Sequence, residues 1–172
     1  IVDSNNAIWM GWDAGVQKFT GSWERITGTN GELNGSIRAI TVAPDQTIWF
    51  ALWQKGLARF NSSGWSLLTP ATAHVPFSAE IIRLAVTGNG NLVTLGLRPP
   101  GYYSGIGIYD GTVWSVYTPP EVGLPSEGVN ALDVDAEGNL RIATREGFVR
   151  WRNGEWVLYK FPRQLPLVND ID

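Results

Sequence analysis

One pattern recurs four times along this 172-residue chain, and it limits the possible folds more than any other feature. Each copy opens with a short apolar segment after a turn-rich stretch, and continues with a glycine, an aromatic residue and a tryptophan. The opening segments are IWMGW at 8–12, IWFAL at 48–52, LVTLG at 92–96 and LRIAT at 140–144. The closing tryptophans are Trp23, Trp65, Trp114 and Trp156, which are 42, 49 and 42 residues apart. Because these landmarks stay in phase, each copy is one structural unit.

The repeats predict β-structure. Their apolar runs are short or alternating, rich in β-branched and aromatic residues, and without a sustained helical period. Another apolar segment precedes each later copy, at 37–42, 81–86 and 129–134, so each unit predicts four short strands. One four-stranded sheet cannot cover both of its faces, whereas neighbouring sheets arranged in a ring can cover them. The sequence therefore predicts an all-β fold of β-propeller blades, with four repeats of four-stranded antiparallel sheets.

Two segments, NAIWMGWDAGVQKF and DAEGNLRIATREGFVRW, carry the pattern best. They resemble the two-component regulator propeller repeat, in which a D-x-x-G turn precedes an apolar-Trp pair, a Gly-apolar pair and an aromatic residue. The third repeat lacks the first Trp, and Arg141 replaces it in the fourth. The resemblance covers nearly the whole chain. It implies a sensor-type propeller in the extracytoplasmic part, periplasmic or on the cell surface, of a signalling protein.

The repeats are circularly permuted within one partial propeller domain, residues 1–172, with expected boundaries at 1–40, 41–84, 85–132 and 133–172. Ile1-Val2 aligns with residues 41–42, while 168–172 align with 37–41. We expect the chain to be part of a longer propeller, since four repeats do not close the seven-bladed ring implied by the resemblance. Two alternatives are a homodimer that completes an eight-bladed ring and a closed four-bladed ring.

Composition argues against several classes of partner. The net charge of −3 and the pI of about 5.1 provide no basic surface for nucleic acid. The chain has no Cys and a single His, His74, which excludes thiolate sites and a multi-His metal site within one chain. No apolar run approaches the roughly 20 residues of a membrane-spanning helix. We expect no cofactor, no bound metal, no catalytic residue and no membrane span.

The repeated tryptophans have two interpretations. Trp9, Trp49 and the four closing tryptophans could form an aromatic binding stripe, or each could fill the same gap between blades. Repetition favours the structural interpretation, because a ligand site requires asymmetry.

Residues that break the repeat predict the binding site. In propellers, the turns between the second and third strands lie with the connections between blades on one face, here called the loop face. The third repeat carries an insertion there, 97–104, and long loops on rigid scaffolds often bind ligands. Aromatic rings offer stacking surfaces, and Lys or Arg binds carboxylate, sulfate or sugar hydroxyl groups. The predicted residues are Trp12, Trp53, Lys55, Arg98, Tyr102, Tyr103 and Arg145.

Three functions remain open from the sequence. The first is a non-enzymatic module that binds a carbohydrate, another small ligand or a protein at the loop face. The second is a structural propeller that assembles with itself or with partner chains. The third is a lyase- or hydrolase-type propeller in which His74 would meet a partner group across the ring, with the site completed by blades missing from this sequence. The segment DVDAEGN at 133–139 also has a weak likeness to a calcium loop, but a solvated β-turn explains it more simply.

Overall fold

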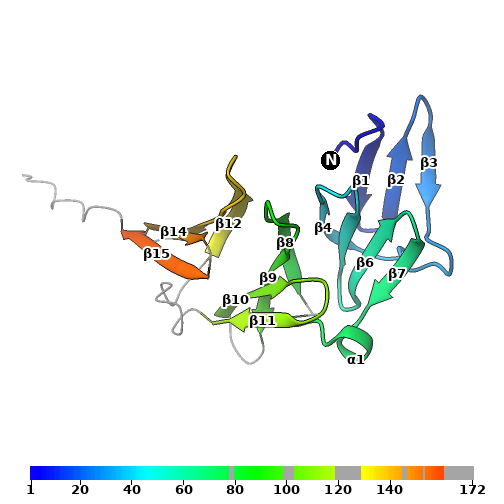
Figure 1. The fold of residues 1–172 in the computed structure, drawn as a ribbon. Helices are drawn as coiled ribbons and strands as arrows, with labels where there is room; N and C mark the ends of the chain where they lie inside the picture. Colours follow the sequence, from blue (N-terminus) through cyan, green and yellow to red (C-terminus); the bar gives the residue numbers. More distant parts are fainter. Residues whose placement is uncertain (78–79, 99–102, 119–128, 145–146, 153, 161–172) are drawn as a thin grey trace, which may run out of the picture.

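The computed structural model describes residues 1–77, 80–98, 103–118, 129–144, 147–152 and 154–160. Their strands form four antiparallel sheets, or blades, that follow one another along the chain (Figure 1). Blade 1 contains β1 (Ile8–Trp12), β2 (Gly15–Phe19) and β3 (Trp23–Ile26). Blade 2 contains β4 (Ile37–Val42), β5 (Ile48–Leu52), β6 (Gly56–Asn61) and β7 (Gly64–Leu68). Blade 3 contains β8 (Ile81–Val86), β9 (Leu92–Arg98), β10 (Tyr103–Tyr109) and β11 (Trp114–Tyr117). Blade 4 contains β12 (Val129–Val134), β13 (Leu140–Thr144), β14 (Gly147–Arg152) and β15 (Glu155–Lys160).

The blades are arranged as an open arc. In Figure 1, strands β1, β4, β8 and β12 lie toward the middle of the molecule, and β3, β7, β11 and β15 lie at its periphery. Strands within a blade pair in sequence order, so each blade is an up-and-down sheet. Radial repetition of such sheets defines a β-propeller, and the predicted all-β fold class is confirmed. The expected repeat boundaries fall within β4, β8 and β12 and stay a prediction.

Blade 1 differs from the others in its inner strand. Its sheet has three strands, and an isolated bridge between Val2 and Ile8 stands where the fourth strand pairs in other blades. The pairs Val42–Ile48, Val86–Leu92 and Val134–Leu140 occupy the same position in blades 2, 3 and 4. Ile1-Val2 therefore aligns structurally with the end of β4, as the sequence repeat indicates.

Each blade has two faces, because side chains alternate along a strand. We call the face toward the preceding blade the leading face, and the face toward the following blade the trailing face. In blade 2, Phe50 on the leading face packs against Trp9 of blade 1, with ring centroids 5.9 Å apart. Trp49 on the trailing face packs against Tyr109 of blade 3, with ring centroids 6.4 Å apart. Strand β5 is consequently buried at all five residues.

The tryptophan positions divide by their place in this stack. Trp9 and Trp49 are only 3% and 7% exposed, which confirms that they fill gaps between blades. The closing Trp65 is also partly buried, against Phe50 and Phe60. Trp23 is 51% exposed, contrary to the expectation for its column. It lies on the leading face of blade 1, at the end of the described stack, where none of the other described blades covers it.

The connection from blade 2 to blade 3 is packed rather than loose. It holds α1 (Pro70–Ala73), the only helix among the described residues, which begins after a Thr69 capping box and ends at His74 in a left-handed conformation. Phe77 follows and is buried. Its side chain lies against Gly96 and Gly105, which pair with each other across β9 and β10. A side chain at either glycine would collide with Phe77, so the two glycines leave the space in which the Phe77 ring packs.

The insertion of the third repeat is partly strand. Leu97 and Arg98 extend β9, and Tyr103 and Ser104 extend β10, with Arg98 opposite Tyr103. The expected loop 97–104 is therefore a longer hairpin, with residues 99–102 outside the described part of the chain. Among the described residues, no helix is long and apolar enough to cross a membrane.

Candidate functional site

The structure describes three of the seven predicted site residues with their side chains: Trp12, Trp53 and Lys55. Arg98 and Tyr103 are placed at the ends of β9 and β10, but nothing is described of their side chains. Tyr102 and Arg145 lie outside the described residues. Whether these seven residues form one site therefore stays a prediction, and the described part of the loop face centres on blade 2.

The most distinctive feature of this region is a stacked pair, Arg38 and Trp53. The guanidinium carbon of Arg38 lies 4.7 Å from the centroid of the Trp53 ring, a cation–π distance. Trp53 is nevertheless 46% exposed, so much of its indole surface remains accessible. Arg38 is not among the residues predicted from the sequence, although it is a charged residue inside the apolar run IRAITV.

Local backbone geometry places this pair. The pairing of β4 with β5 shifts register between Ile37 and Ala39, so Arg38 occupies a β-bulge. A bulge redirects the side chain of its extra residue. Trp53 is the first residue after β5, and its backbone N–H donates a hydrogen bond of 3.0 Å to the carbonyl of Ser36. Bulge and turn thus bring together two residues that are 15 positions apart in the sequence.

Neighbouring polar residues hold the same turn in place. The Lys55 ammonium donates to the backbone carbonyl of Asn34 at 2.5 Å. The Ser36 hydroxyl donates to the Asp13 carboxylate of blade 1 at 2.8 Å. The connection between blades 1 and 2 is therefore tied to the turns of both. The result is an exposed aromatic surface with two cations, Arg38 and Lys55, which suits an anionic or ring-bearing ligand.

The Arg38–Trp53 pair has no counterpart at the equivalent positions of the other blades, as far as the structure describes them. The bulge recurs in β8 and β12, where the corresponding residues are Ile82 and Asn130. In blade 1, β1 is the equivalent of β5, and the residue after it is Asp13 in place of Trp53. The blade-2 pair thus breaks the fourfold pattern, and a ligand site requires such asymmetry.

Trp12 does not share the environment of Trp53. Trp12 is the last residue of β1 and pairs with Gly15, as Leu52 pairs with Gly56 in blade 2. Leu52 belongs to the leading face and is buried against blade 1. By this equivalence, Trp12 belongs to the leading face of blade 1 together with Ile8 and Met10. The structure therefore separates the two tryptophans that the sequence groups together.

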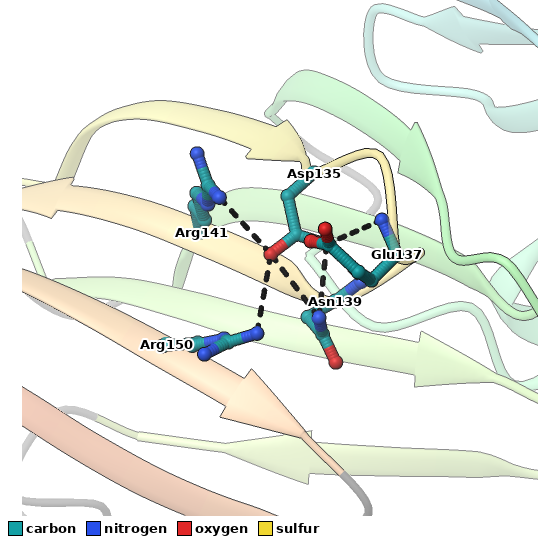
Figure 2. A network of polar contacts seen from close by, with 5 residues as sticks. All are labelled: Asp135, Glu137, Asn139, Arg141 and Arg150. Carbon is teal, nitrogen blue, oxygen red and sulfur yellow. Dashed lines mark hydrogen bonds and ion pairs between the residues drawn. The ribbon is translucent and has the colours of Figure 1, made fainter.

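The candidate calcium loop is a hydrogen-bonded turn (Figure 2). The Asp135 carboxylate accepts hydrogen bonds from the backbone N–H groups of Glu137 and Asn139, at 3.1 and 2.8 Å. Its other oxygen lies 3.2 Å from Arg141 and 3.5 Å from Arg150, so two guanidinium groups supply the positive charge there. The turn interpretation is confirmed, and the described residues contain no group of three potential metal ligands.

His74 is an exposed loop residue. It ends α1 with φ of 50°, and none of the hydrogen bonds or ion pairs found among the described residues involves it. Nothing in the described part of the chain therefore orients His74 as a general base.

A hollow of about 480 Å³ lies between the first turns of blades 1 and 2. The carboxylates of Asp3 and Asp45, which line it, each accept hydrogen bonds within their own turn. Asp3 accepts hydrogen bonds from the N–H groups of Asn5 and Ala7, and Asp45 accepts from the N–H and hydroxyl of Thr47. This hollow is accordingly a by-product of turn structure and a weaker candidate than the Arg38–Trp53 surface.

Fold and surface together define a β-propeller segment whose described residues include an asymmetric aromatic-cationic patch at Arg38 and Trp53. No protein-family model matches the chain, and no curated protein matches it. Solved structures do match. Two of them are of the extracellular domain of BT4673 from B. thetaiotaomicron. BT4673 is described with one structure as a one-component system and with the other as a hybrid two-component system. In both, the TM-score is 0.68 at 16% identity over 96% of this chain.

Two further matches have different roles. A catalytically inactive virginiamycin B lyase from Staphylococcus aureus, solved with quinupristin, matches with a TM-score of 0.65, at 15% identity over 95% of this chain. YCF48 bound to a peptide matches with a TM-score of 0.58, at 14% identity over 90%. This chain spans 22% of the BT4673 domain, 55% of the lyase and 50% of YCF48. These likenesses confirm the propeller fold, and the match to the BT4673 domain agrees with the expected resemblance to two-component regulator propellers. They leave the activity open.

Proposed function

We propose that this chain is a non-enzymatic, sensor-type propeller module that binds a ligand or a partner protein on its loop face. The exposed Arg38–Trp53 pair carries the proposal, because it breaks the repeat at a turn that bulge and hydrogen bonds hold in place. The ligand class that fits best is a saccharide or similar small molecule with a carboxylate or sulfate group. Trp53 would stack on its ring, and Arg38 and Lys55 would bind its anionic group.

The proposal includes an extracytoplasmic location and a role in signalling. Its support is the likeness to BT4673, whose structures are of an extracellular domain. The likeness to virginiamycin B lyase supports the enzymatic alternative, and replacing His74 would test it once an assay exists.

A saccharide screen followed by calorimetry tests the loop-face proposal. Uronic-acid and sulfated oligosaccharides are compared with neutral ones of the same length. For a ligand that binds, Trp53→Ala and Arg38→Ala should each weaken affinity about tenfold, consistent with cation–π and stacking contributions of about 1–2 kcal/mol. Trp53→Phe retains a ring and should bind nearly as well as the parent.

The control is Arg152→Ala, which removes an exposed arginine at the far end of blade 4, where Arg152 pairs with Glu155. Its affinity should equal that of the parent. Equal affinities for the parent, Trp53→Ala and Arg38→Ala would contradict the assignment of this surface.

A structural role is the second candidate, with a second copy of the chain as partner. Two sets of four blades would complete an eight-bladed ring, which is within the known range of propellers. One specific observation favours it: apolar residues are exposed on the leading face of blade 1 and on the trailing face of blade 4. Twice the monomer mass of 18.9 kDa in light scattering would support it.

A further inference from the structure

The trailing face of blade 4 combines exposed aromatic side chains with small and charged ones. It forms a hollow of about 550 Å³, lined by Ala131, Ile142, Ala143, Phe148 and Tyr159 and by the charged Asp133, Arg141 and Arg150. Phe148 is 39% exposed and Tyr159 is 44% exposed, and their rings stack with centroids 4.5 Å apart. Two stacked aromatic rings in an open hollow indicate a surface that binds another apolar surface.

Strand register shows what this surface corresponds to in blade 2. Phe148 pairs with Tyr159 across β14 and β15, as Leu57 pairs with Leu68 across β6 and β7. Arg141 pairs with Arg150, as Trp49 pairs with Arg59. In blade 2 this trailing face is covered by blade 3 and by Val75 and Phe77 of the connection that leads to it, and Leu57 and Leu68 are buried there. The exposed face of blade 4 is therefore a blade-docking face.

The contacts inside the chain show what such a face binds. Trp9 on the trailing face of blade 1 meets Phe50 and Phe60 of blade 2, with ring centroids 5.9 and 6.0 Å apart. Trp49 of blade 2 meets Tyr109 of blade 3, which occupies the position of Phe60. In both interfaces a trailing face binds a leading face that presents an aromatic residue at this position.

The chain exposes a leading face of this kind on blade 1. Ile8 and Met10 occupy the positions of Ile48 and Phe50 and are 41% and 45% exposed, whereas Ile48 and Phe50 are fully buried. Phe19, which is partly buried, occupies the position of Phe60. Its ring centroid lies 5.1 Å from that of the exposed Trp23. The exposure of both faces shows that they do not cover each other within one chain.

We infer that the trailing face of blade 4 binds the leading face of blade 1 of a second copy of this chain. The inference rests on the self-association proposed above and names the surfaces that would make it. Phe19 of one copy then stacks on Arg141 of the other, replacing the Phe60–Trp9 contact with a cation–π contact. The contact is heterologous, and two such contacts related by twofold symmetry close an eight-bladed ring.

Charge substitutions on each face test this contact in the full 172-residue chain. Met10→Asp and Phe148→Asp each place a carboxylate in an apolar interface. Each should weaken dimerisation at least about 100-fold in analytical ultracentrifugation, because one substitution affects both contacts of the ring. Val113→Asp, at an exposed position in the turn after β10, is the control and should dimerise like the parent. Circular dichroism and thermal unfolding check that each variant is folded.

Mixing the two variants identifies the geometry of the contact. In a mixed dimer, both substitutions fall in one contact and the other contact is wild type, so an equimolar mixture of Met10→Asp and Phe148→Asp should dimerise more tightly than either variant alone. Tighter dimerisation of the mixture supports the head-to-tail contact, and its absence overturns it. Dimers that persist in both single variants overturn these surfaces while leaving self-association intact. A parent chain that stays monomeric up to about 100 μM overturns both the proposed self-association and the proposed contact between blade 4 and blade 1.

Discussion

At the first turn of blades 1 and 4, an aspartate has the same structural role. Asp3 and Asp135 each accept two backbone N–H groups of their own turn. Asp3 also accepts a hydrogen bond of 2.8 Å from the indole N–H of Trp9, whereas Asp135 lies 3.2 Å from the guanidinium of Arg141. Arg141 thus replaces the repeat tryptophan as the donor to the turn. This explains how the fourth repeat keeps its turn without the tryptophan.

This network makes Asp135 sensitive to acid. Loss of surrounding water favours the neutral carboxyl, but hydrogen bonds from Asn139 and the charges of Arg141 and Arg150 outweigh it and lower the pKa of Asp135 to about 2. A lowered pKa stabilises the folded state above the ordinary value of 3.8, and this stabilisation is lost as pH falls from about 4 toward 2. We expect Asp135→Asn to be less stable than the parent at pH 7 and to lose less stability on acidification.

Urea unfolding at pH 7, 4 and 3 measures this effect. Glu137→Gln is the matched control, because Glu137 contributes only its backbone N–H to the turn. That variant should follow the parent at every pH. Parallel curves for Asp135→Asn and the parent would show that the carboxylate charge has no part in stability.

At the scale of elements, the connection between blades 2 and 3 depends on one side chain. Phe77 is buried on the Gly96–Gly105 pair and has a φ of 56°, a strained value for a residue other than glycine. Packing must offset that strain. We expect Phe77→Ala to lower the free energy of unfolding by about 3–5 kcal/mol, as for other buried Phe residues.

Chemical denaturation of Phe77→Ala measures this loss. His74→Asn is the control from the same connection, because His74 is exposed and asparagine tolerates the left-handed conformation. It should stay within about 0.5 kcal/mol of the parent. A Phe77→Ala variant as stable as His74→Asn would mean that the connection does not depend on the packing of Phe77 against Gly96 and Gly105.

At the scale of the whole molecule, burial differs between inner and terminal blades. Strand β5 is buried at all five residues, as are residues 92–96 of β9, because another blade covers each face. The equivalent strands β1 and β13 alternate between buried and more exposed residues. A blade that is covered on one side loses less apolar contact when it opens locally.

Hydrogen exchange should reveal this gradient. In dilute protein, amides of β5 and β9 should exchange at least about tenfold more slowly than those of β1 and β13, when only paired amides are compared. Uniform protection across all four strands in a confirmed monomer would contradict the gradient and indicate global opening as one unit.

Several conclusions required no structure. The spacing of Trp23, Trp65 and the later repeats predicts blades, because a stacked fold must place the same residue type in the same gap each time. The turn at 133–139 is also predictable, since Asp and Gly at those positions favour one. Both depend on contacts that are local or repeated, and these leave a period in the sequence.

Tertiary structure decided what lies outside that period. The bulge that carries Arg38 recurs in β8 and β12, but its contact with Trp53 joins two residues 15 positions apart and does not recur among the described residues, so it leaves no period in the sequence. Trp12 and Trp53 occupy similar sequence contexts but different surfaces, because the turn after β1 is one residue shorter than the turn after β5. The exposure of Trp23 follows from its place at the end of the stack. The sequence by itself determined the blade, whereas only the packing of blades against one another decided which faces and side chains are accessible for binding.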